Sequence, residues 1–355
     1  MAPVVVVVAQ AFKESLAIRE VADALVEGVR RAGAVPRLVL GSDGGDGLLD
    51  ALAPMRRTTH EVTGPLGMPV RAELGWLDPA TAVVETRLAC GLFLVAPAAR
   101  DALRASTRGA GQLIAAAAAG GAGTVLVGLG GSATTDGGLG AARAWGWEAW
   151  DAGGTALADG GGALEALARL EPAPPPSARL VALADVRNPL LGAGGAVVYA
   201  PQKGAGPDVV VRLANGLARL AAVAAPWDGP SLARREGAGA AGGLGFGLLC
   251  FGRAELVSGA AWVLDRNDLS GALDGAALVV VAEARFDATS LTGKLAGEVI
   301  ARARARHVPA AVVTPDAAVA PGGVQVTTAA GHWSADDVAR QTARAVRDAL
   351  GLPGF

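Results

Sequence analysis

The segment Gly128-Leu-Gly-Gly-Ser-Ala-Thr-Thr-Asp-Gly-Gly138 combines five glycines with three hydroxyl side chains and one carboxylate. It follows the β-branched stretch Thr124–Val127 and precedes the helical stretch Leu139–Trp145. Glycines permit close backbone approach, hydroxyl groups donate hydrogen bonds, and the start of a helix attracts negative charge. The segment therefore predicts an anion site, for which a tight turn that only packs is the alternative.

Two acidic turns follow stretches that are typical of buried strands. Asp43-Gly-Gly-Asp46-Gly comes after Arg37–Leu40, and Asp185-Val-Arg-Asn188 comes after Leu180–Ala182. The two carboxylates of the first turn suit Mg²⁺ or the hydroxyl groups of a substrate, and the Asp and Asn of the second turn suggest the wall of a site. Helix capping by the aspartates, or an ordinary surface turn, is the alternative.

Lysine is rare in this chain. Among the 31 basic residues only Lys13, Lys203 and Lys294 are lysines, and all three lie in segments that contain glycine or serine. A compact and flexible point charge is suited to contact with phosphate. We expect the lysines to mark a phosphate site, with coincidence as the alternative.

Two more segments carry polar or glycine-rich patterns. Gly237-Ala-Gly-Ala-Ala-Gly-Gly243 fits a second phosphate cradle and a close helix-packing surface equally well. Glu283–Lys294 follows the apolar stretch Ala277–Ala282 and offers acids, hydroxyls and a lysine together. The usual P-loop is absent, because Gly293-Lys294 is followed by leucine.

Alternating strands and helices at both ends of the chain must position these segments. Val4–Ala9 reads as a buried strand and Ile18–Arg31 as an amphipathic helix capped by Ser15. The end of the chain repeats this alternation in four elements, Ala277–Ala282, Leu295–Arg304, Ala310–Val313 and Val324–Thr327, before a closing helix at Ala335–Leu350. Ligands of the mostly parallel sheets that such units form bind at the carboxyl ends of the strands.

The length of 355 residues exceeds what one hydrophobic core usually supports, so two lobes are expected. We predict an α/β protein in which the two ends of the chain, 1–66 and 287–355, build one doubly wound lobe. Residues 67–286 then form an inserted α/β lobe with a mixed sheet, because short strands and Ala-rich helices alternate there.

Composition excludes several classes of function. The net charge of −2, with both signs scattered, argues against a nucleic-acid partner. The apolar runs are too short to span a membrane and no secretory signal is apparent, so we expect a cytoplasmic protein. The two cysteines, Cys90 and Cys250, are expected to be buried thiols. The three histidines, His60, His307 and His332, do not have the spacing of zinc ligands.

Taken in order, these segments resemble the bacterial glycerate kinase family, of the glycerate 2-kinase type. The matching residues span nearly the whole chain and include all three lysines: Phe12-Lys-Glu-Ser-Leu16, Asp43-Gly-Gly-Asp-Gly47, Gly130-Gly-Ser-Ala-Thr-Thr-Asp-Gly-Gly138, Asp185-Val-Arg-Asn-Pro-Leu190, Pro201-Gln-Lys-Gly-Ala205, Gly237–Gly243 and Thr292-Gly-Lys294. The resemblance implies a discontinuous flavodoxin-like lobe with an inserted second lobe. It also implies that D-glycerate and MgATP become phosphoglycerate, usually the 2-phosphate, and ADP. The oligomeric state is left open, with a homodimer as one possibility.

The resemblance implies roles at matching positions. Asp185 and Asp287 compete as the base that accepts the substrate proton, with Asp185 preferred. The other catalytic residues are Lys13 and Lys203, and the substrate contacts are Ser15, Asp43, Gly44, Gly45, Asn188 and Lys294. The nucleotide contacts are Gly130, Gly131, Ser132, Thr134, Thr135, Gly242 and Gly243, and the Mg²⁺ contacts are Asp46 and Asp136.

Two loops depart from the family pattern. The family usually has Asp-Ser where this chain has Gln10-Ala11, and it has Thr-Gly-Glu-Gly and Asp-Gly-Gln-Thr where this chain has Val281–Ala284 and Asp287–Ser290. The loss of a carboxylate at position 10 removes a charge that could hold Mg²⁺ or orient a lysine. A kinase for a related hydroxy acid and a non-catalytic nucleotide or metabolite binder are therefore the alternatives.

Overall fold

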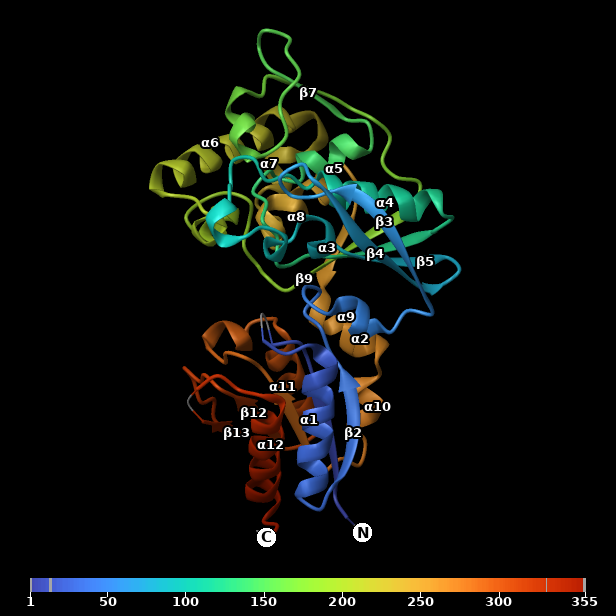
Figure 1. The fold of residues 1–355 in the computed structure, drawn as a ribbon, viewed down its shortest axis with the longest axis vertical. Helices are drawn as coiled ribbons and strands as arrows, with labels where there is room; N and C mark the ends of the chain where they lie inside the picture. The colour runs from blue at the N-terminus through green and yellow to red at the C-terminus, as the bar shows by residue number, and fades with distance from the viewer. Residues whose placement is uncertain (1, 13–14, 330, 354–355) are drawn as a thin grey trace. The chain divides into compact units, whose positions relative to one another are not determined.

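The structure is a computed structural model that describes residues 2–12, 15–329 and 331–353 (Figure 1). The chain divides into two compact units. Unit 1 consists of Met1–Leu52 and Ala260–Phe355, and unit 2 is the continuous segment Ala53–Gly259. One unit is thus assembled from both ends of the chain.

Unit 1 contains a sheet of five parallel strands. Its spatial order is β13 (Val324–Thr328), β12 (Ala310–Thr314), β11 (Leu278–Ala282), β1 (Val4–Ala9) and β2 (Val35–Leu40). When the five strands are renumbered in chain order within the unit and read from β2 to β13, this is the flavodoxin-like order 2-1-3-4-5. Continuous runs of valine form β1 and β11 because both faces of their strands are buried.

Helices cover both faces of this sheet. The side chains of Val6, Val8, Val279 and Val281 pack with α9 (Gly259–Arg266), α10 (Leu269–Leu273) and α11 (Leu295–Ala305). The alternate face contacts α1 (Ile18–Arg31) and α12 (Ala335–Leu350). These two helices approach closely, since a Cβ at Gly28 would lie 2.5 Å from the carbonyl oxygen of Ala339. Two short elements complete the unit, α2 (Leu48–Leu52) and η7 (Ala288–Leu291).

Unit 2 contains a six-stranded mixed sheet. The order is β10 (Glu255–Ser258), β9 (Arg179–Ala184), β6 (Thr124–Gly128), β5 (Thr81–Glu85), β4 (Pro69–Asp78) and β3 (Arg56–Thr63). The first four strands are parallel, and β4 and β3 continue the sheet in antiparallel pairing. A separate antiparallel pair joins β7 (Glu148–Trp150) to β8 (Arg169–Glu171).

Ala- and Gly-rich helices surround the sheet of unit 2. The α-helices are α3 (Arg87–Cys90), α4 (Arg108–Ala119), α5 (Leu139–Ala144), α6 (Pro207–Val223), α7 (Gly229–Leu232) and α8 (Ala240–Cys250). The 3₁₀ helices are η1 (Leu92–Leu94), η2 (Pro97–Ala99), η3 (Gly161–Ala166), η4 (Ala196–Tyr199), η5 (Pro201–Lys203) and η6 (Ala225–Trp227). Away from the sheet, Trp147 packs on Trp227 and Phe251 with ring centroids 4.8 and 4.7 Å apart.

The boundaries of the two units differ from the division predicted at residues 66 and 287. Arg56–Thr63 belongs to unit 2, because it forms an antiparallel pair with β4. Leu278–Ala282 belongs to unit 1, because it pairs with β1 along its length. Strand pairing is therefore the physical reason for the difference.

The start of α1 also differs from the expectation. Its N-cap is Ala17, and the Glu20 carboxylate accepts a hydrogen bond from the Ala17 backbone N–H at 2.7 Å. The hydroxyl of Ser15 instead donates to the carbonyl oxygen of Phe12 at 3.3 Å. Ser15 therefore stabilises the turn before the helix and does not cap the helix.

Over residues 2–12, 15–329 and 331–353, no helix is both long enough and apolar enough to cross a bilayer.

Candidate functional site

The glycine-rich loop of unit 2 begins at the carboxyl end of β6 and is held by the strands and turns on either side. Leu129 donates its backbone N–H to the carbonyl oxygen of Leu183 on β9. The carbonyl oxygen of Gly131 accepts from Leu92, and Ala133 donates to Cys90, each at 2.8 Å. The loop is thus fixed before any ligand binds.

Several donors of this loop are left without partners. In the part of the chain that the structure describes, the backbone N–H groups of Gly130, Gly131 and Ser132 form no hydrogen bond. The hydroxyl of Thr135 is buried and has no partner either. Consecutive backbone N–H groups in a glycine loop form an anion-binding concavity. The geometry therefore favours the predicted anion site over a turn that only packs.

Asp136 anchors the end of the loop. Its carboxylate accepts hydrogen bonds from the Thr107 N–H and hydroxyl at 2.8 and 2.9 Å, and from the N–H groups of Gly138 and Gly140 at 3.1 and 3.2 Å. Burial raises the pKa of Asp136, and these four donors oppose that rise. The residue is 1% exposed, so a hydrated metal ion has no access to it. Asp136 therefore does not fit the metal role that the resemblance implied and holds the loop to the starts of α4 and α5.

Lys203 lies beneath the same loop. Its ammonium group donates to the carbonyl oxygen of Thr134 at 2.6 Å and to the hydroxyl of Ser132 at 3.3 Å. The residue is buried, and this burial lowers the pKa of Lys203 to about 8. An ammonium group has three donors, so one remains for a ligand. The structure thus brings together Lys203, Ser132 and Thr134, three of the predicted site residues.

Gly242 and Gly243 pack against this loop from α8. Their φ angles are +69° and +90°, and a Cβ at Gly242 would lie 1.8 Å from the carbonyl oxygen of Thr134. The carbonyl oxygen of Gly242 accepts a hydrogen bond from Gly137 at 3.1 Å. Of the two alternatives for Gly237–Gly243, the geometry favours close packing over a second phosphate cradle.

The turn after β9 lies beside the glycine loop because β9 and β6 are neighbours. Asp185 is half-buried directly after this strand. The side chain of Asn188 donates to the carbonyl oxygen of Gly194 at 2.6 Å and accepts from the Tyr199 hydroxyl at 3.1 Å. Asn188 therefore braces its own loop, and Asp185 lies at the sheet edge where ligands of parallel strands bind.

In unit 1 the predicted residues follow β1, β2 and β11, which are adjacent strands. The strand order reverses between β1 and β11, and such a switch point is where doubly wound sheets bind ligands. Gln10 joins the two loops there by donating its side-chain amide to the carbonyl oxygen of Ala282 at 3.2 Å. Lys13, which the sequence assigned to this loop, lies outside the described residues.

The acidic turn after β2 adopts a local hydrogen-bonded form. Asp43 accepts a hydrogen bond from the N–H of Gly45 at 2.9 Å, and Gly44 donates to the hydroxyl of Ser42 at 3.2 Å. The half-buried Asp46 lies in the same turn, before α2. A Cβ at Gly41, which opens this loop, would lie 2.7 Å from Leu295 at the start of α11. The turn after β2 therefore lies next to the segment that contains Lys294.

Asp287 and Lys294 lie in one short network after β11. Asp287 accepts hydrogen bonds from the Thr289 N–H and hydroxyl at 2.8 and 2.6 Å, and it caps η7. The hydrogen bonds from Thr289 are the main reason why the pKa of Asp287 is lowered. The ammonium group of Lys294 donates to the Thr289 hydroxyl at 2.8 Å. The structure therefore brings Asp287 and Lys294 together through Thr289.

Glu283, to which the sequence gave no role, is the first residue of this loop. Its Oε1 accepts a hydrogen bond from the Ser290 hydroxyl at 3.0 Å. Its Oε2 is buried and has no hydrogen-bond partner in the described structure. Burial raises the pKa of Glu283 to about 7. A signal for it was present in the sequence, since an acid directly after five buried apolar residues is unusual.

Sequence reasoning also missed two buried residues next to the glycine loop, Thr107 and Glu85. Thr107 holds Asp136, and its own hydroxyl accepts from the N–H of Ala141 at 3.0 Å. Glu85 is buried at the carboxyl end of β5, where Arg87 lies 3.7 Å away and packs over the ring of Phe93 at 4.4 Å. The sequence signal for Glu85 was an acidic residue at the end of an apolar strand. No sequence signal pointed to Thr107.

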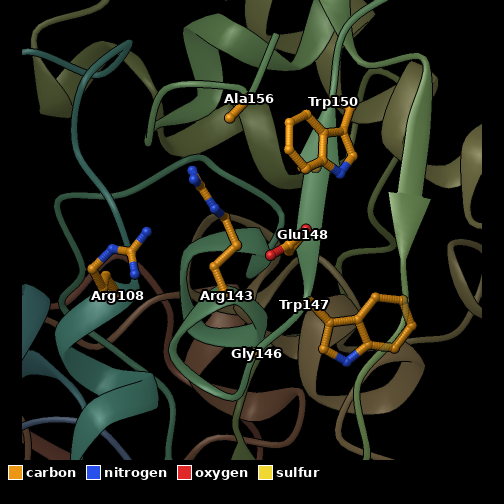
Figure 2. A pocket seen from close by; sticks show the side chains of 8 residues that line it. Arg108, Arg143, Gly146, Trp147, Glu148, Trp150 and Ala156 are labelled. Carbon is orange, nitrogen blue, oxygen red and sulfur yellow. The ribbon is translucent and has the colours of Figure 1, made fainter. Parts of the chain in front are cut away.

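One hollow of about 250 Å³ lies elsewhere in unit 2 (Figure 2). Arg108, Arg143, Glu148 and Trp150 line it, and no predicted site residue does. Both arginines are paired with one carboxylate, that of Asp159. Glu148 adds a further negative charge, so the hollow offers no marked preference for an anion or a cation.

No group of three or more His, Cys, Asp or Glu side chains among residues 2–12, 15–329 and 331–353 could hold a metal ion. A metal ion that arrives with a nucleotide needs only one or two protein carboxylates, because phosphates and water supply its other ligands.

Comparison with known proteins finds relatives over most of the chain. A family model described as the glycerate kinase family matches residues 5–350. The chain is 39% identical over 316 residues to a glycerate kinase of Bacillus subtilis (strain 168), and 37% identical over 317 residues to a glycerate 2-kinase of Escherichia coli (strain K12). Each alignment covers 86% of this chain and 83% of the relative.

A solved structure shows the same fold. It is described as glycerate kinase 2 from Salmonella typhimurium LT2, and it superposes with a TM-score of 0.81 at 34% sequence identity. The superposition covers 99% of both chains. The chain belongs to the glycerate kinase family.

Proposed function

We propose that this protein transfers the γ-phosphoryl group of ATP to a hydroxyl group of D-glycerate, with 2-phosphoglycerate and ADP as the products. Family membership supports the reaction, and the relative from Escherichia coli is named a glycerate 2-kinase. The observation that carries the proposal is the group formed by Lys203 and the loop from Gly130 to Asp136 in unit 2. It combines unpaired N–H groups with a buried ammonium group.

This group suits the phosphates of a nucleotide. A phosphoryl transfer enzyme must position the phosphates and neutralise the negative charge that spreads over their oxygens. The N–H groups of Gly130, Gly131 and Ser132 supply fixed donors, and Lys203 supplies a charge close to them. With a pKa of about 8, Lys203 is mostly protonated at neutral pH. We therefore assign the triphosphate to this loop.

The residues of unit 1 suit a small hydroxy acid. Lys294 is a cation for the carboxylate of glycerate, and the Asp43 turn has oxygens that can accept from its hydroxyl groups. Asp185 and Asp287 stay as the predicted candidates for the base. The hydrogen bonds that lower the pKa of Asp287 make it a weak proton acceptor at neutral pH.

We propose ATP with Mg²⁺ as the phosphoryl donor, because Mg²⁺ binds nucleotide phosphates and would neutralise part of their charge. Asp136 does not fit as a ligand of this ion because it is buried beneath four donors. Asp46 stays a predicted contact, so no step of the reaction is assigned through the metal. The homodimer and the cytoplasmic location also stay predictions from the sequence.

The test is a coupled assay of ADP release with D-glycerate and MgATP, with the product identified by phosphorus NMR. We expect turnover by the wild type and a loss of about 100-fold or more in kcat/KM for Lys203→Met. Arg179→Met is the matched control, because Arg179 is an exposed cation of the same unit that pairs with the exposed Glu255 and begins β9, at the opposite end of that strand from Asp185. It should keep wild-type turnover. ADP release that does not rise above background with glycerate, by a folded protein that binds ATP, would contradict the proposal.

A further inference from the structure

Glu283 occupies a distinctive position in unit 1. It is the first residue after β11, and β11 and β1 flank the switch point of the sheet. The backbone just before it is fixed, because Gln10 donates a hydrogen bond to the carbonyl oxygen of Ala282. The side chain therefore starts from a rigid point at the sheet edge where ligands are expected.

The two oxygens of Glu283 are in different situations. Oε1 accepts the hydroxyl hydrogen of Ser290, and that hydroxyl is itself held by the N–H of Asp287 at 3.1 Å. Oε2 is shielded from water and has no hydrogen-bond partner among the described residues. A buried carboxylate oxygen without a hydrogen-bond donor destabilises the ionised form of the group. Uptake of a proton removes the charge and with it this unfavourable free energy. Glu283 is therefore prepared to receive one proton.

The charged groups around Glu283 come from three other places. They are Lys294 at the start of α11, Asp43 after β2, and Asp287 at the start of η7. Lys294 favours the ionised form of Glu283, and the two aspartates disfavour it. On the same loop, Arg285 lies 3.5 Å from Asp287 and 3.6 Å from Asp316. Because these charges act in opposite directions, burial is the main effect on the pKa of Glu283.

Asp287, the competing acid of the same loop, is in the opposite situation. It already accepts two hydrogen bonds from Thr289, and Arg285 lies near it. Proton uptake would weaken these bonds, so Asp287 stays ionised and works as a cap of η7. Of these two acids, Glu283 is thus the one whose surroundings favour transfer of a proton near neutral pH.

We propose that Glu283 accepts the proton of the acceptor hydroxyl during phosphoryl transfer, an inference that rests on the proposed function. The hydroxyl oxygen of glycerate forms a bond to the γ-phosphorus of ATP, and the bond from that phosphorus to the oxygen of ADP breaks. The hydroxyl proton moves to Oε2 of Glu283. The charge-neutral carboxyl group then loses the proton to solvent when the products leave.

The experiment measures kcat against pH for the wild type, Glu283→Gln and Ser290→Ala. The wild type should lose activity below a pH near 7, as Glu283 takes up a proton before the substrate arrives. Glu283→Gln should lower kcat by about 100-fold or more and remove this limb of the profile. Ser290→Ala removes a hydrogen bond that favours the ionised form, so the limb should move to higher pH. If Glu283 had only a structural role, Ser290→Ala would leave the limb of the profile at the same pH.

Glu298→Gln is the matched control, since Glu298 is a partly exposed acid of the same unit that pairs with Arg302 at 2.8 Å. Its profile should follow that of the wild type. A second measurement needs no turnover: NMR of ¹³C-labelled glutamate in the free enzyme should show one group that titrates near pH 7 and disappears in Glu283→Gln.

The outcomes separate this inference from the proposed function. Turnover by Glu283→Gln at the wild-type rate with the same profile would overturn the role of Glu283 alone. A profile whose limb disappears in Asp287→Asn, and persists in Glu283→Gln, would return the role to Asp287. No turnover of glycerate by the wild type would overturn the proposed function and this inference together.

Discussion

The side-chain amide of Gln10 donates a hydrogen bond to the carbonyl oxygen of Ala282 at 3.2 Å. This bond connects the loop after β1 with the loop after β11, although the two residues are 272 positions apart in the chain. The family that the sequence resembles usually has aspartate at this position. A carboxylate has no hydrogen to donate to a carbonyl oxygen, so glutamine changes how the two loops are joined.

We expect Gln10→Asp to raise the pKa of Glu283 above its value of about 7, because it adds a like charge near that carboxyl group. Gln10→Ala is the control, since it removes the hydrogen bond without adding a charge. Both variants should lower the free energy of unfolding by about 1 kcal/mol. NMR titration of Glu283 without Mg²⁺ measures the pKa, and equal values in the two variants would contradict the prediction.

Asp136→Asn should destabilise unit 2 by about 2 to 4 kcal/mol. Its side-chain NH₂ group would face N–H and O–H donors that now bind the carboxylate, which leaves buried groups unpaired. Denaturation by urea measures the effect. Asp151→Asn is the control, because Asp151 accepts two backbone hydrogen bonds in an exposed turn and should change stability little. Equal urea midpoints for the two variants would contradict the conclusion that Asp136 anchors the glycine loop.

Gly242→Ala should cost about 3 kcal/mol or more, or prevent folding of unit 2. The added Cβ would lie 1.8 Å from the carbonyl oxygen of Thr134, and the φ of +69° is unfavourable for alanine. Gly194→Ala tests the same chemical change where no atom lies within 4 Å, and it should be tolerated. Circular dichroism and thermal unfolding report both. A Gly242→Ala protein as stable as Gly194→Ala would show that this contact can relax.

The KM for ATP should rise as the pH increases above 8. The pKa of Lys203 is about 8, so the ammonium group loses its charge over that range and attracts phosphate less strongly. In Lys203→Arg the charge persists, and KM should stay flat even if the larger side chain weakens binding overall. Lys294→Arg should show the same rise as the wild type, because it leaves Lys203 in place. A wild-type KM that is constant up to pH 9 would refute this assignment.

Local patterns predicted most of the elements. Val4–Ala9, Ile18–Arg31 and Ala335–Leu350 have the predicted bounds, because a β-branched run and an amphipathic period are properties of neighbouring residues. Arg56–Thr63 went unrecognised since it is a polar strand at the edge of its sheet. The boundaries of the units depend on strand pairing between distant segments, which no local pattern contains.

Local patterns also indicated which loops to consider for the candidate site. Loops that follow buried strands could be found from glycine, acid and lysine, and Lys203 does lie on the glycine loop. The role of Asp136 depends on Thr107, which is 29 residues away. The orphaned oxygen of Glu283 depends on burial, which the sequence does not give. The comparisons favour a glycerate kinase over the alternative functions considered for the altered loops.

The order in which unit 1 is assembled has a consequence for synthesis on the ribosome. β1 pairs with β11, yet all of Ala53–Gly259 is translated between β2 and β11. The growing polypeptide must therefore carry the valine-rich edge of β1 uncovered while unit 2 emerges and collapses as one continuous stretch. Nascent chains that stall before β11 would offer this edge to chaperones.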